Sequence, residues 1–73
     1  MRTIEIREDK GARVPWVVDM YDDIEGLIGT FDSETPVTYR HKDGVWGVIG
    51  CEPFRVLWAP VLIVNGKTME VED

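Results

Sequence analysis

The sequence predicts a single small α+β domain, in which one short helix packs on an antiparallel sheet of about five or six strands. Three observations support this prediction. Polar and apolar residues alternate from Thr3 to Arg7, turns typical of β-hairpins occur at 43–44 and 65–66, and apolar residues recur with helical spacing between 24 and 31. A chain of 73 residues has room for one core, so residues 1–73 are expected to form one domain.

The N-terminal segment is expected to form two paired strands. After the alternating strand, the sequence Glu8-Asp9-Lys10-Gly11 is typical of a turn. The chain from Arg13 to Met20 can then pair back, with Trp16, Val18 and Met20 on one face. A longer helix that begins near Pro15 is the competing interpretation, because apolar residues between 16 and 31 also fall on one helical stripe. Residues 14–21 are therefore strand or helix.

A short helix is expected near residues 23–31. Asp22 suits the N-cap, and Glu25 stands three residues later, where it can complete a capping box. Gly26 and Gly29 each weaken such a helix by about 1 kcal/mol relative to alanine, so tertiary packing must stabilise it. The apolar residues of this stretch have the spacing of one helical face: Ile24, Leu27, Ile28 and Phe31.

A hairpin around Asp43-Gly44 is expected next. This dipeptide favours the positive φ angles that match strand twist, and it lies between two predicted strands, 37–42 and 45–50. Pairing outward from the turn sets His41 opposite Trp46 and Tyr39 opposite Val48. The strand alternation then predicts a core face of Val37, Tyr39, His41, Trp46 and Val48, and an outer face of Thr38, Arg40 and Lys42.

The C-terminal part predicts a further strand from Phe54 to Trp58, ended by Pro60, and a last hairpin around Asn65-Gly66. This hairpin pairs residues 61–64 with residues 67–72, so that Leu62 faces Met69 and Ile63 faces Thr68. Because 61–64 is apolar on both faces, it is either a central strand covered twice or an edge strand that a partner covers.

The net charge of −6 comes from one segment of the chain. Between residues 14 and 39 there are six acids and no lysine or arginine, whereas the other acids and bases cancel. The field of such a segment attracts basic partners and repels phosphates, so direct binding to nucleic acid or anionic membranes is not expected. The alternative is that these acids only form the solvated face and cap of the helix. The six acids are Asp19, Asp22, Asp23, Glu25, Asp32 and Glu34.

The sequence contains no recognisable catalytic or cofactor-binding motif. His41 and Cys51 are too few for a zinc site, and the predicted register sets them far apart, so no metal, cofactor or enzyme activity is expected. Tyr39 and Trp46 lie near Arg40 and Lys42 as in a base-stacking platform, but the alternation puts rings and bases on opposite faces.

These observations predict a small non-enzymatic protein-binding module. Its acidic surface would engage a basic, nucleic-acid-binding site on a larger protein and so inhibit it. The alternative is a homo-oligomeric structural or assembly subunit, joined through an apolar strand with Trp58, Val61 and Ile63 as contact residues. The single cysteine, and the absence of a signal peptide or a long apolar run, favour a cytoplasmic location.

Overall fold

The structure, a computed structural model, describes residues 1–50 and 56–70. Within these residues it contains eight strands and no helix. The strands are β1 (Arg2–Glu8), β2 (Trp16–Asp22), β3 (Gly26–Ser33), β4 (Thr38–Lys42), β5 (Val45–Ile49), β6 (Val56–Ala59), β7 (Val61–Val64) and β8 (Lys67–Thr68). The predicted α+β class is therefore wrong, and the fold is all-β.

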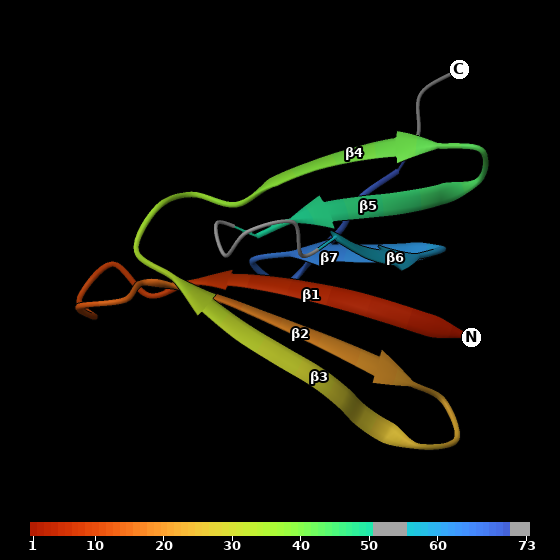
Figure 1. The fold of residues 1–73 in the computed structure, drawn as a ribbon, viewed down its shortest axis with the longest axis horizontal. Coiled ribbons are helices and arrows are strands. Elements are labelled where there is room, and N and C mark those ends of the chain that lie inside the picture. The colour runs from red at the N-terminus through yellow and green to blue at the C-terminus, as the bar shows by residue number, and fades with distance from the viewer. Residues whose placement is uncertain (51–55, 71–73) are drawn as a thin grey trace.

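The strands form two sheets (Figure 1). The larger sheet has the order β3-β2-β1-β7-β8 and the smaller has the order β4-β5-β6. All neighbours are antiparallel except β1 and β7, which run parallel. The chain changes sheets between β3 and β4, and again at Pro60 between β6 and β7. The prediction of one antiparallel sheet missed this division, because it depends on pairing between residues far apart in the sequence.

The predicted helix near 23–31 is wrong. Residues 23–25 form a turn, and β3 starts at Gly26. The Asp22 carboxylate does accept hydrogen bonds from the backbone N–H groups of Ile24 and Glu25, at 2.9 and 3.3 Å. A side chain that bonds the backbone two and three residues later closes a tight turn as well as it caps a helix. Gly26 then takes a φ of 76°, which reverses the chain into β3.

The strand interpretation of residues 14–21 is confirmed from Trp16 onward by β2, although residues 13–15 are not part of the strand, and the longer helix from Pro15 is wrong. Val18 is fully buried, and Trp16 and Met20 pack against the core from the same face. β2 lies between β1 and β3, with a bulge between Met20 and Tyr21. Its backbone is thus paired on both sides.

Both predicted hairpin turns are confirmed, with their registers. Asp43 and Gly44 have φ values of 54° and 82°, and His41 pairs with Trp46. Asn65 and Gly66 have φ values of 49° and 83°, and Ile63 pairs with Thr68. β6 also ends before Pro60 as predicted. The predicted strand 67–72 is too long, because β8 ends at Thr68; Phe54 and residues 71–72 lie outside the described residues.

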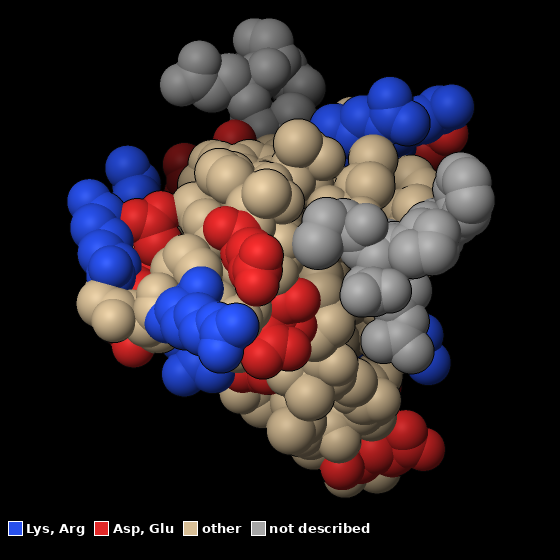
Figure 2. Space-filling model, turned by 60° about the vertical axis from the view of Figure 1, so that its left-hand side comes forward, with Lys and Arg blue, Asp and Glu red and all other residues tan. Residues whose placement is uncertain are grey.

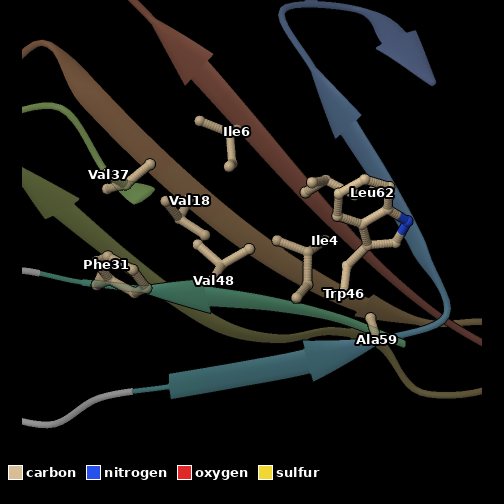
Figure 3. Packing of buried hydrophobic residues seen from close by; sticks show 9 residues of the cluster. All are labelled: Ile4, Ile6, Val18, Phe31, Val37, Trp46, Val48, Ala59 and Leu62. Atoms are coloured by element: carbon tan, nitrogen blue, oxygen red, sulfur yellow. The ribbon is translucent and has the colours of Figure 1, made fainter. Parts of the chain in front are cut away.

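The core lies between the two sheets, where side chains from both point toward one another (Figure 3). Ile4, Ile6, Val18 and Leu62 come from the larger sheet and face Val48 of the smaller. The predicted core face of the β4–β5 hairpin is buried only in part. Val37, Trp46 and Val48 are buried, but Tyr39 and His41 are exposed and contact the Trp46 ring edge-on.

Candidate functional site

The carboxylate of Asp19, the first of the predicted acidic residues, is already bonded to other side chains of the same molecule. Asp19 lies on the outer face of the larger sheet, yet only 6% of it is exposed. Its carboxylate accepts hydrogen bonds from Arg7 Nη2 at 2.6 Å, from Thr30 Oγ1 at 2.7 Å and from the Tyr21 hydroxyl at 3.4 Å. Partial burial, with the charges of Asp19 and Glu5, raises the pKa of Tyr21, so this hydroxyl remains a donor. Asp19 is therefore a structural residue.

Asp22 and Asp23 belong to the turn between β2 and β3. The backbone N–H groups of Ile24 and Glu25 hold the pKa of Asp22 below its usual value, and Arg2 Nε lies 3.9 Å from its carboxylate. Asp23 accepts a hydrogen bond from the amino group of Met1 at 2.8 Å. Both carboxylates thus have cationic neighbours in the same chain.

Glu25, Asp32 and Glu34 are exposed, but they do not gather in one place. Glu25 lies in the turn before β3, whereas Asp32 and Glu34 lie at the other end of this eight-residue strand. Such a strand is about 26 Å long. On the face that Figure 2 shows, basic and acidic side chains lie beside one another. The structure therefore does not bring the six acids together as one surface.

The three predicted apolar contact residues are also separated. Trp58 lies on β6 in the smaller sheet, whereas Val61 and Ile63 lie on β7, opposite Thr3 and Glu5 of β1 in the larger sheet. Val61 and Ile63 are half-buried, and β7 pairs with β1 on one side and β8 on the other. β7 is thus not an edge strand, but it is not the strand covered on both faces that the sequence offered as the alternative, because Val61 and Ile63 stay half-buried and β8 pairs only with Ile63 and Val64.

Trp58 belongs to the outer face of the smaller sheet. Trp46 and Val48 of β5 point into the core, so Gly47 and Ile49 between and beyond them face outward. Trp58 pairs with Gly47, and a Cβ atom at Gly47 would lie 2.6 Å from the indole ring. The ring therefore lies directly over the glycine, where any other residue would displace it.

Apolar side chains remain exposed on this outer face. Trp58 is 44% exposed, Val56 39% and Ile49 37%. We call this surface the Trp58 face. The residues that the structure describes on it are Thr38, Arg40, Lys42, Val45, Gly47, Ile49, Val56 and Trp58.

The charged residues described on the Trp58 face are both basic. The register sets Arg40 beside Gly47, in the same cross-strand row as Trp58, and Lys42 beside Val45. Among the described residues, neither base forms an ion pair. An open depression of about 240 Å³ lies at this edge, lined by Thr38, Tyr39, Arg40 and Ile49. The face thus offers an exposed aromatic ring, aliphatic side chains and two bases that form no ion pair with any other described residue.

The sequence pattern predicts that Arg40 and Lys42 face outward and that Trp58 is a contact residue, but it does not indicate that the three lie on one face. Their proximity depends on the register between β5 and β6, which the predicted turns do not fix. Gly47 was the one available signal, since a glycine inside an apolar strand often marks the close approach of another group.

The two residues considered for metal binding or catalysis are His41 and Cys51. His41 is exposed and packs on Trp46, and Cys51 lies outside the described residues. In 1–50 and 56–70, no three His, Cys, Asp or Glu side chains gather closely enough to hold a metal ion. The same residues include no helix that is long and apolar enough to cross a membrane. Comparisons with protein families, with curated proteins and with solved structures gave no match.

Proposed function

We propose that this protein is a non-enzymatic protein-binding module, and that the Trp58 face holds an acidic segment of its partner. The observation that carries the proposal is the placement of Trp58, which is 44% exposed over Gly47 in the same row as Arg40. Tryptophan and arginine are the residues most enriched at the energetic centres of protein interfaces. The ring already rests against the Gly47 backbone in the free chain, and a side chain that is positioned before binding lowers the entropy that binding costs.

Charge selects the kind of partner. Arg40 and Lys42 would attract carboxylates, and no described residue of the Trp58 face repels them. A single nucleic-acid strand is less well matched, because two bases neutralise only two phosphates while the whole chain carries a net charge of −6. The face also presents one stacking ring, where single-strand binders use several in succession.

The acidic surface predicted from the sequence is a second candidate for the contact surface. Asp19 is buried, and Asp22 and Asp23 have cationic neighbours, so its charge is weaker than the sequence suggested. One observation still favours it. Ile24 is 94% exposed at the tip of the β2–β3 turn, near Leu27, which is 56% exposed. An apolar tip beside Glu25 would suit a pocket with a basic rim. Self-association through β7 has less support, since that strand is paired on both sides.

Comparative capture from a native lysate tests the proposal. Proteins retained by the wild-type chain are compared with those retained by Trp58→Ala and by Leu27→Ala. Both variants remove an exposed apolar side chain, but on different sheets. We expect at least one partner whose affinity is about 30-fold lower for Trp58→Ala than for the wild type. Its affinity for Leu27→Ala should equal that for the wild type. A partner lost with Leu27→Ala but kept with Trp58→Ala would contradict the proposal and favour the turn surface. Circular dichroism of each variant checks that the sheets remain intact.

A further inference from the structure

The smaller sheet has a free edge along β4. β4 pairs with β5 on one side, and no other described strand pairs with it on the opposite side, so it borders the sheet (Figure 1). All five residues of β4 are exposed. Unpaired edges of this kind are templates for the addition of another strand.

The register shows which backbone groups face the free edge. In a hairpin with a two-residue turn, the residues that flank the turn exchange both hydrogen bonds, and this pattern recurs at every second pair. Lys42 therefore bonds Val45, and Arg40 bonds Gly47. The N–H and C=O groups of Tyr39 and His41 must then point away from β5. The close edge-on contact of His41 with Trp46, at 5.2 Å between ring centroids, fits a pair that exchanges no backbone bonds.

We propose that β4 receives an extended, acidic segment of the partner protein as a fourth strand of the smaller sheet. This inference rests on the proposed function and adds a second contact at the edge of the sheet. A strand beyond β4 lies about 14 Å from β6, so Trp58 contacts another part of the same partner. The backbone of the segment bonds Tyr39 and His41. Every second side chain of the segment lies on the same face as Arg40 and Lys42, and these side chains are acidic. The alternate side chains lie beside the Tyr39 and His41 side chains, and they are apolar.

The charges of β4 also disfavour a second copy of this chain as the occupant. If two β4 strands paired with each other, Arg40 and Lys42 of one copy would lie beside the same residues of the other. Like charges on paired strands destabilise the pairing, whereas carboxylates beside the two bases stabilise it. Edge strands commonly carry lysine to prevent self-pairing, so the same side chains discourage self-association and select an acidic partner.

A titration of the ¹⁵N-labelled chain with a capped peptide of about seven residues, in which glutamate alternates with valine, tests this inference. We expect saturable shifts and slower hydrogen exchange at the amides of Tyr39 and His41. Tyr39→Pro should lower the affinity for the peptide by about fivefold or more, because it removes an N–H that donates to the peptide and not to β5. Tyr39→Ala is the matched control, since it keeps that N–H and should retain most of the binding. If Tyr39→Pro fails to fold, His41→Pro makes the same test.

Several outcomes would overturn strand addition. One is that no saturable shifts occur up to about 2 mM peptide. Another is that a lysine–valine peptide or oligothymidine binds as well as the glutamate–valine peptide. A third is that dimerisation protects both amides when no peptide is present. Shifts confined to Val56, Trp58 and Ile49 would also overturn it, but would leave the proposed function standing. The proposed function is tested by the Trp58→Ala capture and not by this peptide, so the two results are separable.

Discussion

At the residue scale, Asp19 joins three strands of the larger sheet. Its carboxylate on β2 bonds Arg7 on β1 and Thr30 on β3, and 6% of the residue is exposed. Arg7 itself is about half exposed, so solvent screens part of the charge interaction. We expect Asp19→Ala to lower the free energy of unfolding by about 1–3 kcal/mol, measured by urea denaturation. Asp32→Ala, at an exposed residue of β3, is the control and should change it by less than about 0.5 kcal/mol. Equal effects of the two would contradict a structural role for Asp19.

Two glycines lie under aromatic rings, and they should respond differently to alanine. A Cβ atom at Gly50 would lie 2.7 Å from the Phe31 ring, which is buried in the core, whereas the one at Gly47 meets Trp58, which is 44% exposed. Phe31 has no room to move, while the indole can turn into solvent. We expect Gly50→Ala to cost about 1–3 kcal/mol in thermal or urea unfolding. Gly47→Ala should cost less but displace Trp58, seen as a shift of its indole N–H signal. An unmoved indole signal would show that the ring does not rest on Gly47.

At the scale of elements, the turn between β2 and β3 should be sensitive to acid through Asp22. Its pKa lies below the ordinary 3.8, chiefly because the Ile24 and Glu25 N–H groups stabilise the carboxylate. This contribution is therefore complete above pH 3.8 and is lost as the pH falls through the lower, folded-state pKa. We expect the stability of the wild type to fall more steeply than that of Asp22→Asn below this pH. Urea midpoints measured between about pH 5 and about pH 2 check it, and parallel curves would contradict it.

The hairpins could be predicted from the sequence, whereas the β2–β3 turn could not. Asp43-Gly44 and Asn65-Gly66 encode positive φ angles locally, and these fix the register of the flanking strands. The Asp22 carboxylate, which accepts hydrogen bonds from the Ile24 and Glu25 N–H groups, is equally suited to a helix cap and to a β-turn. The decision comes from β2, which offers residues 26–33 a pairing partner across the bulge. The parallel pairing of β1 with β7 likewise depends on contacts between opposite ends of the chain.

At the scale of the whole molecule, the charge pattern was the least reliable guide to a surface. The sequence places six acids between residues 14 and 39. It does not reveal that Arg7 on β1 reaches diagonally to Asp19 on the neighbouring strand β2, or that the length of β3 separates Glu25 from Asp32. The outward positions of Arg40 and Lys42 followed from alternation alone. Joining them to Trp58 required the fold, because the chain changes sheets immediately after β6.

Hydrogen exchange of the chain with a captured partner tests the central claim, that the Trp58 face is the contact surface. Amides of β4, β5 and β6 are compared in the free chain and in the complex. We predict slower exchange at Tyr39, His41 and Trp58, with no change in the β2–β3 turn. Slower exchange confined to residues 22–27, with β4 and β6 unchanged, would contradict the account.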